Sequence, residues 1–146
     1  MVTKLTGIIR LDTENLSFQD LKRIVEGDPS DRSTAEEPDI NTSILPRGKT
    51  GRLDWQSVRQ VVGGGTLITI AGHLDQFGVH QYHLTWLLRW WRRLNEELPV
   101  ADALLHAEMP RINYYLSWNG ESVRVVSYRR ERRNPGRSKR PMSTAA

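Results

Sequence analysis

A single long amphipathic segment constrains the fold of this chain more than any other feature. Between Gln81 and Leu98, apolar residues recur with the three- and four-residue spacing of an α-helix, and Pro99 follows directly. The apolar stripe consists of Leu84, Leu87, Leu88, Trp91, Leu94 and Leu98. A helix with one continuous apolar stripe has to bury it against another element. The segment therefore predicts a long helix packed on a sheet.

The same segment carries a second face of aromatic and basic residues. Tyr82, Trp86 and Trp90 recur at every fourth position, and the arginines beside them are Arg89 and Arg93. One sheet cannot cover both faces of a helix, so three interpretations stay open. The domain wraps around the helix and buries both faces, or this face is an interface for a partner or a second copy, because Trp, Tyr and Arg are enriched at hot spots. The third interpretation is stacking on nucleotide bases.

The part of the chain before this helix predicts two strands and two short helices. Residues 4–11 and 66–71 read as strands, and a short helix is expected between the N-cap Ser17 and the terminating Gly27. A second short helix is expected after Asp54, which can serve as its N-cap. The apolar positions of that helix are Trp55, Val58, Val61 and Val62.

The part of the chain after the long helix predicts a hairpin. Residues 100–107 are expected to form one or two further helical turns. Asn119-Gly120 then separates two strand patterns, 111–118 and 121–128, and this dipeptide is the strongest short-range hairpin signal. We therefore expect an α+β fold, in which a small sheet of about four strands, including the C-terminal hairpin, packs against one long helix and two shorter helices.

The expected hairpin has two distinct faces. A two-residue turn at Asn119-Gly120 places Trp118 opposite Glu121 and Tyr115 opposite Arg124, as a cation–π pair. The face directed to the core comprises Ile112, Tyr114, Leu116, Val123 and Val125, and the outer face comprises Arg111, Tyr115, Ser117, Ser122, Arg124 and Tyr128. The outer face is either a solvated surface or a nucleic-acid platform, with aromatic rings for stacking and arginines for phosphate.

Positive charge is concentrated at the C-terminal end of the chain. The basic residues there are Arg129, Arg130, Arg132, Arg133, Arg137, Lys139 and Arg140. Seven basic residues against Glu131 give this segment a charge of +6, so the total of +4 leaves −2 for residues 1–128. A segment with so few apolar groups cannot form a core. We expect one α+β domain over 1–128 and a basic, disordered tail over 129–146.

Composition and spacing exclude several kinds of structure and site. Residues 28–52 form a long polar stretch, which we expect to be a mobile loop. The absence of cysteine excludes disulfides, thiolate metal sites and cysteine nucleophiles. No apolar run approaches the ~20 residues of a membrane span, and the N-terminus has no secretory pattern. We therefore expect an intracellular protein, cytoplasmic or nuclear.

Motifs that would indicate catalysis are incomplete. Gly48-Lys49-Thr50 lacks the glycine that a phosphate loop needs five residues earlier, where Ser43 stands, and Gly63-Gly64-Gly65 precedes a strand, whereas dinucleotide-binding glycines follow one. A stretch rich in possible metal ligands comprises His73, Asp75, His80 and His83. No second carboxylate or thiolate completes a metal site there. We therefore predict no enzyme, no cofactor, no metal and no small-molecule substrate.

The function we favour from the sequence is a non-catalytic nucleic-acid-binding protein. It would bind RNA or DNA largely independently of sequence and would self-associate. Its contact residues would be Arg111, Tyr115, Arg124 and Tyr128 of the hairpin and the seven basic residues of the tail. The alternative is a self-assembling structural or adaptor protein of the viral matrix type. It would bind partner proteins or an anionic membrane surface through the aromatic helix face and the tail.

Overall fold

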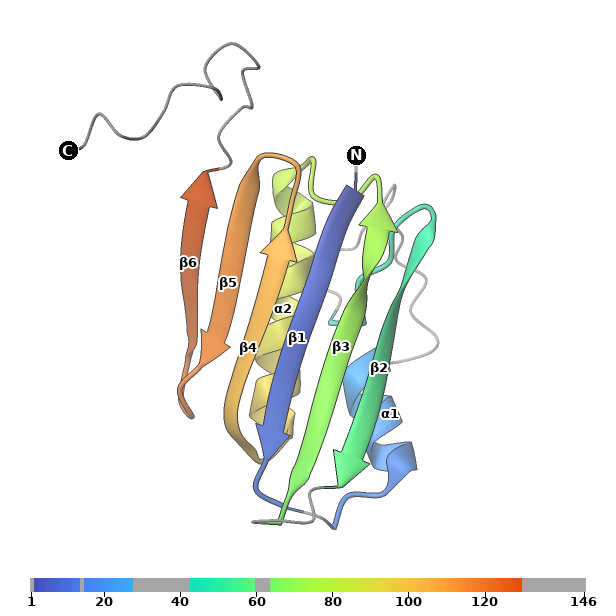
Figure 1. Cartoon of the computed structure of the whole chain (residues 1–146), viewed down its shortest axis with the longest axis vertical. Coiled ribbons are helices and arrows are strands. Elements are labelled where there is room, and N and C mark those ends of the chain that lie inside the picture. The colour runs from blue at the N-terminus through green and yellow to red at the C-terminus, as the bar shows by residue number, and fades with distance from the viewer. Residues whose placement is uncertain (1, 14, 28–42, 60–63, 130–146) are drawn as a thin grey trace, which may run out of the picture.

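A computed structural model describes residues 2–13, 15–27, 43–59 and 64–129 of the chain. Its elements in chain order are β1 (Val2–Leu11), α1 (Phe18–Glu26), β2 (Gly51–Arg59), β3 (Thr66–Asp75), α2 (Gln81–Glu97), β4 (Val100–Glu108), β5 (Ile112–Trp118) and β6 (Val123–Arg129). Within the described residues, the strands form one sheet in the order β2-β3-β1-β4-β5-β6, and every neighbouring pair is antiparallel. Figure 1 shows this sheet face-on.

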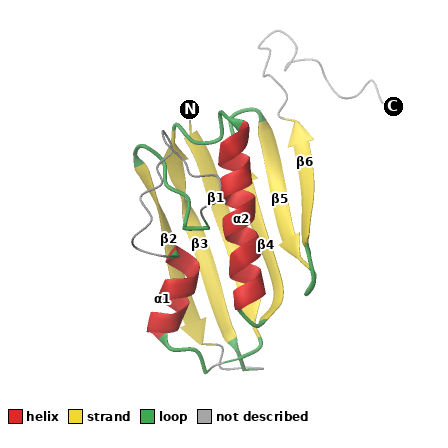
Figure 2. Ribbon diagram, turned by 180° about the vertical axis from the view of Figure 1, so that it is seen from behind, coloured by secondary structure: helices red, strands yellow, loops and turns green. Residues whose placement is uncertain are grey.

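Both helices lie on the same face of the sheet: Figure 2 shows them in front of the strands, and Figure 1, from the opposite side, shows the strands in front of both helices. The chain order β1-α1-β2-β3-α2-β4, with β1 between β3 and β4, is the split β-α-β arrangement of ferredoxin-like domains. The hairpin β5-β6 extends that sheet beyond β4. No helix in the part of the chain that the structure describes is both long and apolar enough to cross a membrane.

The expected sheet of about four strands with three helices is wrong, because two segments predicted as helical are strands. In β2, Leu53, Trp55 and Ser57 alternate toward the helices, and their neighbours are exposed. In β4, Ala103, Leu105 and Ala107 alternate into the core. A period of two specifies a strand. Trp55 and Val58 of β2 also fit a helical spacing, and the small alanines of β4 weakened the alternation.

The short helix α1 forms as expected between Ser17 and Gly27. Ser17 lies in the N-cap position, and its Oγ accepts a hydrogen bond from the Asp20 N–H at 3.2 Å. Gly27 follows α1 with φ of 82°, a conformation that glycine adopts without strain. The buried residues of α1 are Leu21, Ile24 and Val25, and they join the core. The predicted strands 4–11 and 66–71 and the helix 81–98 correspond to β1, β3 and α2.

Both faces of α2 are buried, which decides among the three interpretations of its aromatic residues. Trp86 and Trp90 are fully buried, and their Nε1 groups donate hydrogen bonds to Ile44 O at 2.9 Å and Val25 O at 2.7 Å. The end of α1 and residues 43–45 therefore cover this face. Trp86 and Trp90 are core residues, and the interpretation that they form a contact surface is wrong.

The other residues of that face differ in exposure. Arg93 is half-buried and donates to Ser43 O at 3.1 Å, to Ile24 O and to Glu97 Oε2 at 2.9 Å, so it joins α2 to the same segments. Tyr82 is half-buried, and its ring stacks on His80 with centroids 4.9 Å apart. Arg89 is exposed. The viral matrix alternative depended on this face as a surface, and the face is instead largely a packing layer.

Candidate nucleic-acid interface

The functional candidate lies on the open face of the sheet, opposite the helices. In β1 and β3, alternate residues point to this face, and the ladder aligns them into rows across the strands. One row contains Thr6, His106, Tyr115 and Val126, and the next toward the end of β6 contains Lys4, Glu108, Asn113 and Tyr128. A sheet face without a helix leaves such side chains accessible to a ligand.

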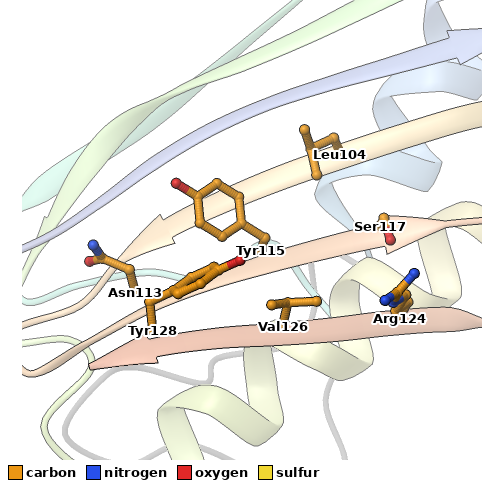
Figure 3. Close-up of a pocket in the computed structure, with 7 residues that line it drawn as sticks. All are labelled: Leu104, Asn113, Tyr115, Ser117, Arg124, Val126 and Tyr128. Atoms are coloured by element: carbon orange, nitrogen blue, oxygen red, sulfur yellow. The ribbon is translucent and has the colours of Figure 1, made fainter. Parts of the chain in front are cut away.

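A depression of about 510 Å³ lies on this face over β4, β5 and β6. Its lining residues are Leu104, Asn113, Tyr115, Ser117, Arg124, Val126 and Tyr128. Figure 3 shows these side chains on the same side of the three strands, with Tyr115 beside Tyr128. A second depression of about 380 Å³ adjoins it over β1, β3 and β4, and Leu104 lines both. The two hollows together cross most of the sheet.

Aromatic rings define one end of the larger depression. The Tyr115 ring stacks on the His106 imidazole, with centroids 4.4 Å apart and planes inclined by 5°. The Tyr128 ring stands nearly perpendicular to that of Tyr115, at 83° and 5.7 Å. Tyr128 is 57% exposed, so much of its ring surface is accessible to a ligand. Tyr128 therefore packs against Tyr115, which is itself stacked on His106.

Arg124 places a positive charge at the other end of the same depression. It is exposed, and no carboxylate among the described residues forms an ion pair with it. An unpaired guanidinium beside an exposed phenol ring combines the donors that bind phosphate with a surface on which a base can stack.

The hairpin register differs from the expected one. Asn119 N donates to Ser122 O at 3.4 Å, so the two-residue loop is Gly120-Glu121, and Trp118 pairs with Val123. The ladder is displaced by two residues, which keeps every side chain on its predicted face. Tyr115 therefore lies opposite Val126, and Arg124 lies opposite Ser117. The predicted direct Tyr115–Arg124 pair is wrong, although both residues line one depression.

The remaining predicted contact residues are distributed as follows. Arg111 is exposed in the turn between β4 and β5, outside the depression. Arg129 is the last residue of β6, so the basic segment begins inside the sheet. Arg130, Arg132, Arg133, Arg137, Lys139 and Arg140 lie outside the described residues, as does most of the predicted loop, residues 28–42.

Some residues of the depression were missed from the sequence. Asn113 shares the alternation of Tyr115 along β5, and that period of two could have identified it. Ser117 was placed on the outer face of the hairpin but was not named as a contact residue. Leu104 and His106 could not be placed, because their segment was predicted as helical turns. His73, Asp75, His80 and His83 do not assemble either: in the described part of the chain, no three potential ligand side chains group around a metal position.

The chain matches no known family model and no curated protein sequence. Among solved structures it is similar to a phage SAM lyase in the apo state, with 11% sequence identity, a TM-score of 0.41, and coverage of 90% of this chain and 92% of that chain. That neighbour is an enzyme, which contradicts the prediction of a non-catalytic protein, and the prediction is withdrawn. The likeness is too low to assign a reaction, a substrate or a site to this chain.

Proposed function

We propose that the protein binds single-stranded nucleic acid across the open face of its sheet. The depression over β4–β6 would hold unpaired bases, and the basic residues from Arg129 onward would contact the phosphate backbone. The observation that carries this proposal is the exposed Tyr128 ring, packed edge-to-face against Tyr115, with the unpaired Arg124 in the same depression.

Base stacking would supply the affinity at the depression. An aromatic ring stacked on a base contributes about 1–3 kcal/mol, and the contribution tolerates any base because each base has a π-face. Tyr128 offers such a ring, and Asn113 and Ser117 offer polar groups beside it. Exposed Leu104 and Ile8, which are direct partners across β4 and β1, extend an apolar surface toward the second depression.

The geometry favours single strands over duplexes. Bases in a duplex stack on each other and face inward, so a tyrosine on a broad sheet reaches only their edges. Unpaired bases can be splayed onto a sheet and stacked on its aromatic residues. We therefore expect a preference for single-stranded RNA or DNA with little dependence on sequence.

The basic residues would add a salt-sensitive component. The segment from Arg129 onward carries a charge of +6, as seven basic residues against Glu131. Each neutralised phosphate of a single strand lowers the slope of log K against log salt by about 0.7. Removing residues 130–146 should therefore weaken binding and flatten its salt dependence, while the contribution of Tyr128 remains.

The test is fluorescence anisotropy with a labelled oligouridine and a duplex of the same length, at two salt concentrations. Tyr128→Ala should weaken binding of the single strand about tenfold, within the range of one stacked base. Arg124→Gln should weaken binding and reduce its salt dependence. The matched controls are Phe18→Ala, another exposed ring, and Arg59→Gln, an exposed arginine on β2 at the opposite edge, and both should bind like the unaltered protein.

Three outcomes would overturn the proposal. The first is an absence of salt-dependent binding to any oligonucleotide by the full chain. The second is equal loss of binding in Tyr128→Ala and Phe18→Ala. The third is retention on vesicles with anionic headgroups without oligonucleotide binding, which would assign the basic residues to a membrane surface instead.

A further inference from the structure

The outer edge of β6 has the backbone groups needed to pair with another strand. In the described residues, β6 pairs with β5 on one side and with no strand on the other. The hydrogen-bonded pair Asn119–Ser122 fixes which groups are free, because such pairs alternate along an antiparallel ladder. The backbone N–H and C=O groups of the odd-numbered residues therefore point outward. These residues are Val123, Val125, Ser127 and Arg129.

Apolar side chains flank this edge on both faces of the sheet. Val125 points to the helix side and is 43% exposed, because α2 lies over the centre of the sheet and leaves β6 uncovered. Val126 points to the open face and lines the depression. Natural edge strands are usually protected by charges or by a covering element. The edge strand β2 carries an Arg52–Asp54 ion pair at 2.6 Å, whereas the charged residues of β6 are two arginines near its ends, Arg124 and Arg129.

We infer that β6 pairs antiparallel with β6 of a second copy of this chain, about a two-fold axis at Val126. In an antiparallel pair, the numbers of facing residues always add up to the same total. The outward-pointing groups belong to odd-numbered residues in both copies, so they face one another only when that total is even. Among the registers with an even total, the one centred on Val126 overlaps the whole of Val123–Arg129. Val125 then pairs with Ser127 of the second copy through hydrogen bonds, and Val126 faces Val126.

This register is self-complementary in its side chains. On the open face it sets Arg124 directly opposite Tyr128 of the second copy, and the two-fold axis repeats this pair. Arg124, Val126 and Tyr128 all line the depression, so each copy contributes a guanidinium next to the other copy's exposed ring. A guanidinium over a tyrosine ring is attractive. An interface in which the same patch meets itself is the form expected of a two-fold dimer.

The dimer would join the two open faces into one continuous sheet surface. The depression of one copy would then continue into that of the other across Val126. This inference rests on the edge of β6 and needs no nucleic acid, although it shares Arg124 and Tyr128 with the proposed binding surface. An interface of one strand pair is small, so the dimer is expected to exchange with monomer at micromolar concentrations.

The test uses the full chain, treated with nuclease and measured in high salt so that nucleic acid cannot bridge copies. Sedimentation velocity over a concentration series should give a monomer–dimer equilibrium. Val126→Lys places two ammonium groups face to face at the axis and should abolish the dimer. Val58→Lys makes the same change on β2, where valine is 55% exposed, and should leave the dimer intact. Circular dichroism verifies that both variants are folded.

Cross-linking tests the register. The chain has no cysteine, so a single introduced cysteine can form a disulfide only with its own counterpart. Opposed residues of a non-hydrogen-bonded pair lie about 4.5 Å apart at Cα, which a disulfide can span. Val126→Cys should therefore cross-link on mild oxidation much faster than Val125→Cys or Val58→Cys. A chain that stays monomeric at all concentrations, a dimer insensitive to Val126→Lys, or preferential cross-linking at position 125 or 58 would overturn the inference.

Discussion

The imidazole of His106 lies face to face with the phenol ring of Tyr115, with centroids 4.4 Å apart and planes inclined by only 5°. The two residues are direct partners across β4 and β5, so the ladder itself sets their separation. His106 therefore packs on one face of Tyr115, and the Tyr128 ring packs edge-to-face against Tyr115 with centroids 5.7 Å apart.

Removing the imidazole should therefore lower the stability of the domain. His106→Ala is expected to lower the free energy of unfolding by about 0.5–1.5 kcal/mol, the contribution of an aromatic pair. His106→Phe should retain most of that stability, because the ring remains and the Nε2 atom has no hydrogen-bond partner among the described residues. Urea denaturation measures the difference. Equal stability of the alanine and phenylalanine variants would show that the stack contributes nothing.

Burial of Trp86 and Trp90 in α2 leads to a prediction that separates core from interface. Trp90→Ala should lower the free energy of unfolding by about 3–5 kcal/mol, because it empties a packed site and removes the hydrogen bond to Val25 O. Phe18→Ala, at a ring that is 60% exposed and stacks on Trp55, should cost only about 0.5–1.5 kcal/mol, the contribution of one aromatic pair. Urea denaturation and sedimentation compare the two. A stable Trp90→Ala monomer derived from an oligomer would contradict the assignment to the core.

The residues that were predicted well share one property: their local pattern had a single interpretation. The stripe of α2 runs through several turns, and Ser17 and Gly27 bracket α1 with an N-cap and a positive φ. The outer face of the hairpin was also correct, since a displacement by two residues leaves each side chain on its face. The sequence therefore placed Tyr115, Arg124 and Tyr128 on one face, although it did not give their cross-strand partners.

The failures came from patterns with two interpretations or from contacts distant in sequence. Trp55 and Val58 fit both a helix and a strand, and the pairing of β2 with β3 decides for the strand. Burial of Trp86 depends on Ile44, a residue 42 positions away, and no local pattern contains that contact. His106 joined the candidate site only because β4 lies between β1 and β5.

The turn of the hairpin offers a test of the register. Gly120 has φ of 97°, and a Cβ placed there would meet no atom within 4 Å, so the cost of a side chain is purely conformational. Gly120→Ala should lower the free energy of unfolding by about 1–2 kcal/mol, and Gly120→Asn should cost less, since asparagine tolerates positive φ. Glu121→Ala is the control, with an expected effect within about 0.5 kcal/mol. Equal effects in thermal unfolding of Gly120→Ala and Glu121→Ala would contradict this turn.

Two adjacent arginines of α2 should differ sharply in their contribution to stability. The Arg93 side chain is 21% exposed and donates to Ser43 O and Ile24 O as well as to Glu97, whereas the Arg92 side chain is 72% exposed and pairs only with Glu96 among the described residues.

Arg93→Met keeps the aliphatic packing but leaves two backbone carbonyls without their donor. We expect it to lower the free energy of unfolding by about 2–3 kcal/mol, because hydrogen bonds to a charged group are among the stronger ones. Arg92→Met should cost no more than about 0.5 kcal/mol, and high salt should remove that effect. Arg93→Lys should not restore stability, since one ammonium cannot reproduce the fork of a guanidinium. Urea denaturation at two salt concentrations distinguishes these outcomes, and equal losses in the two methionine variants would show that Arg93 does not join α2 to α1.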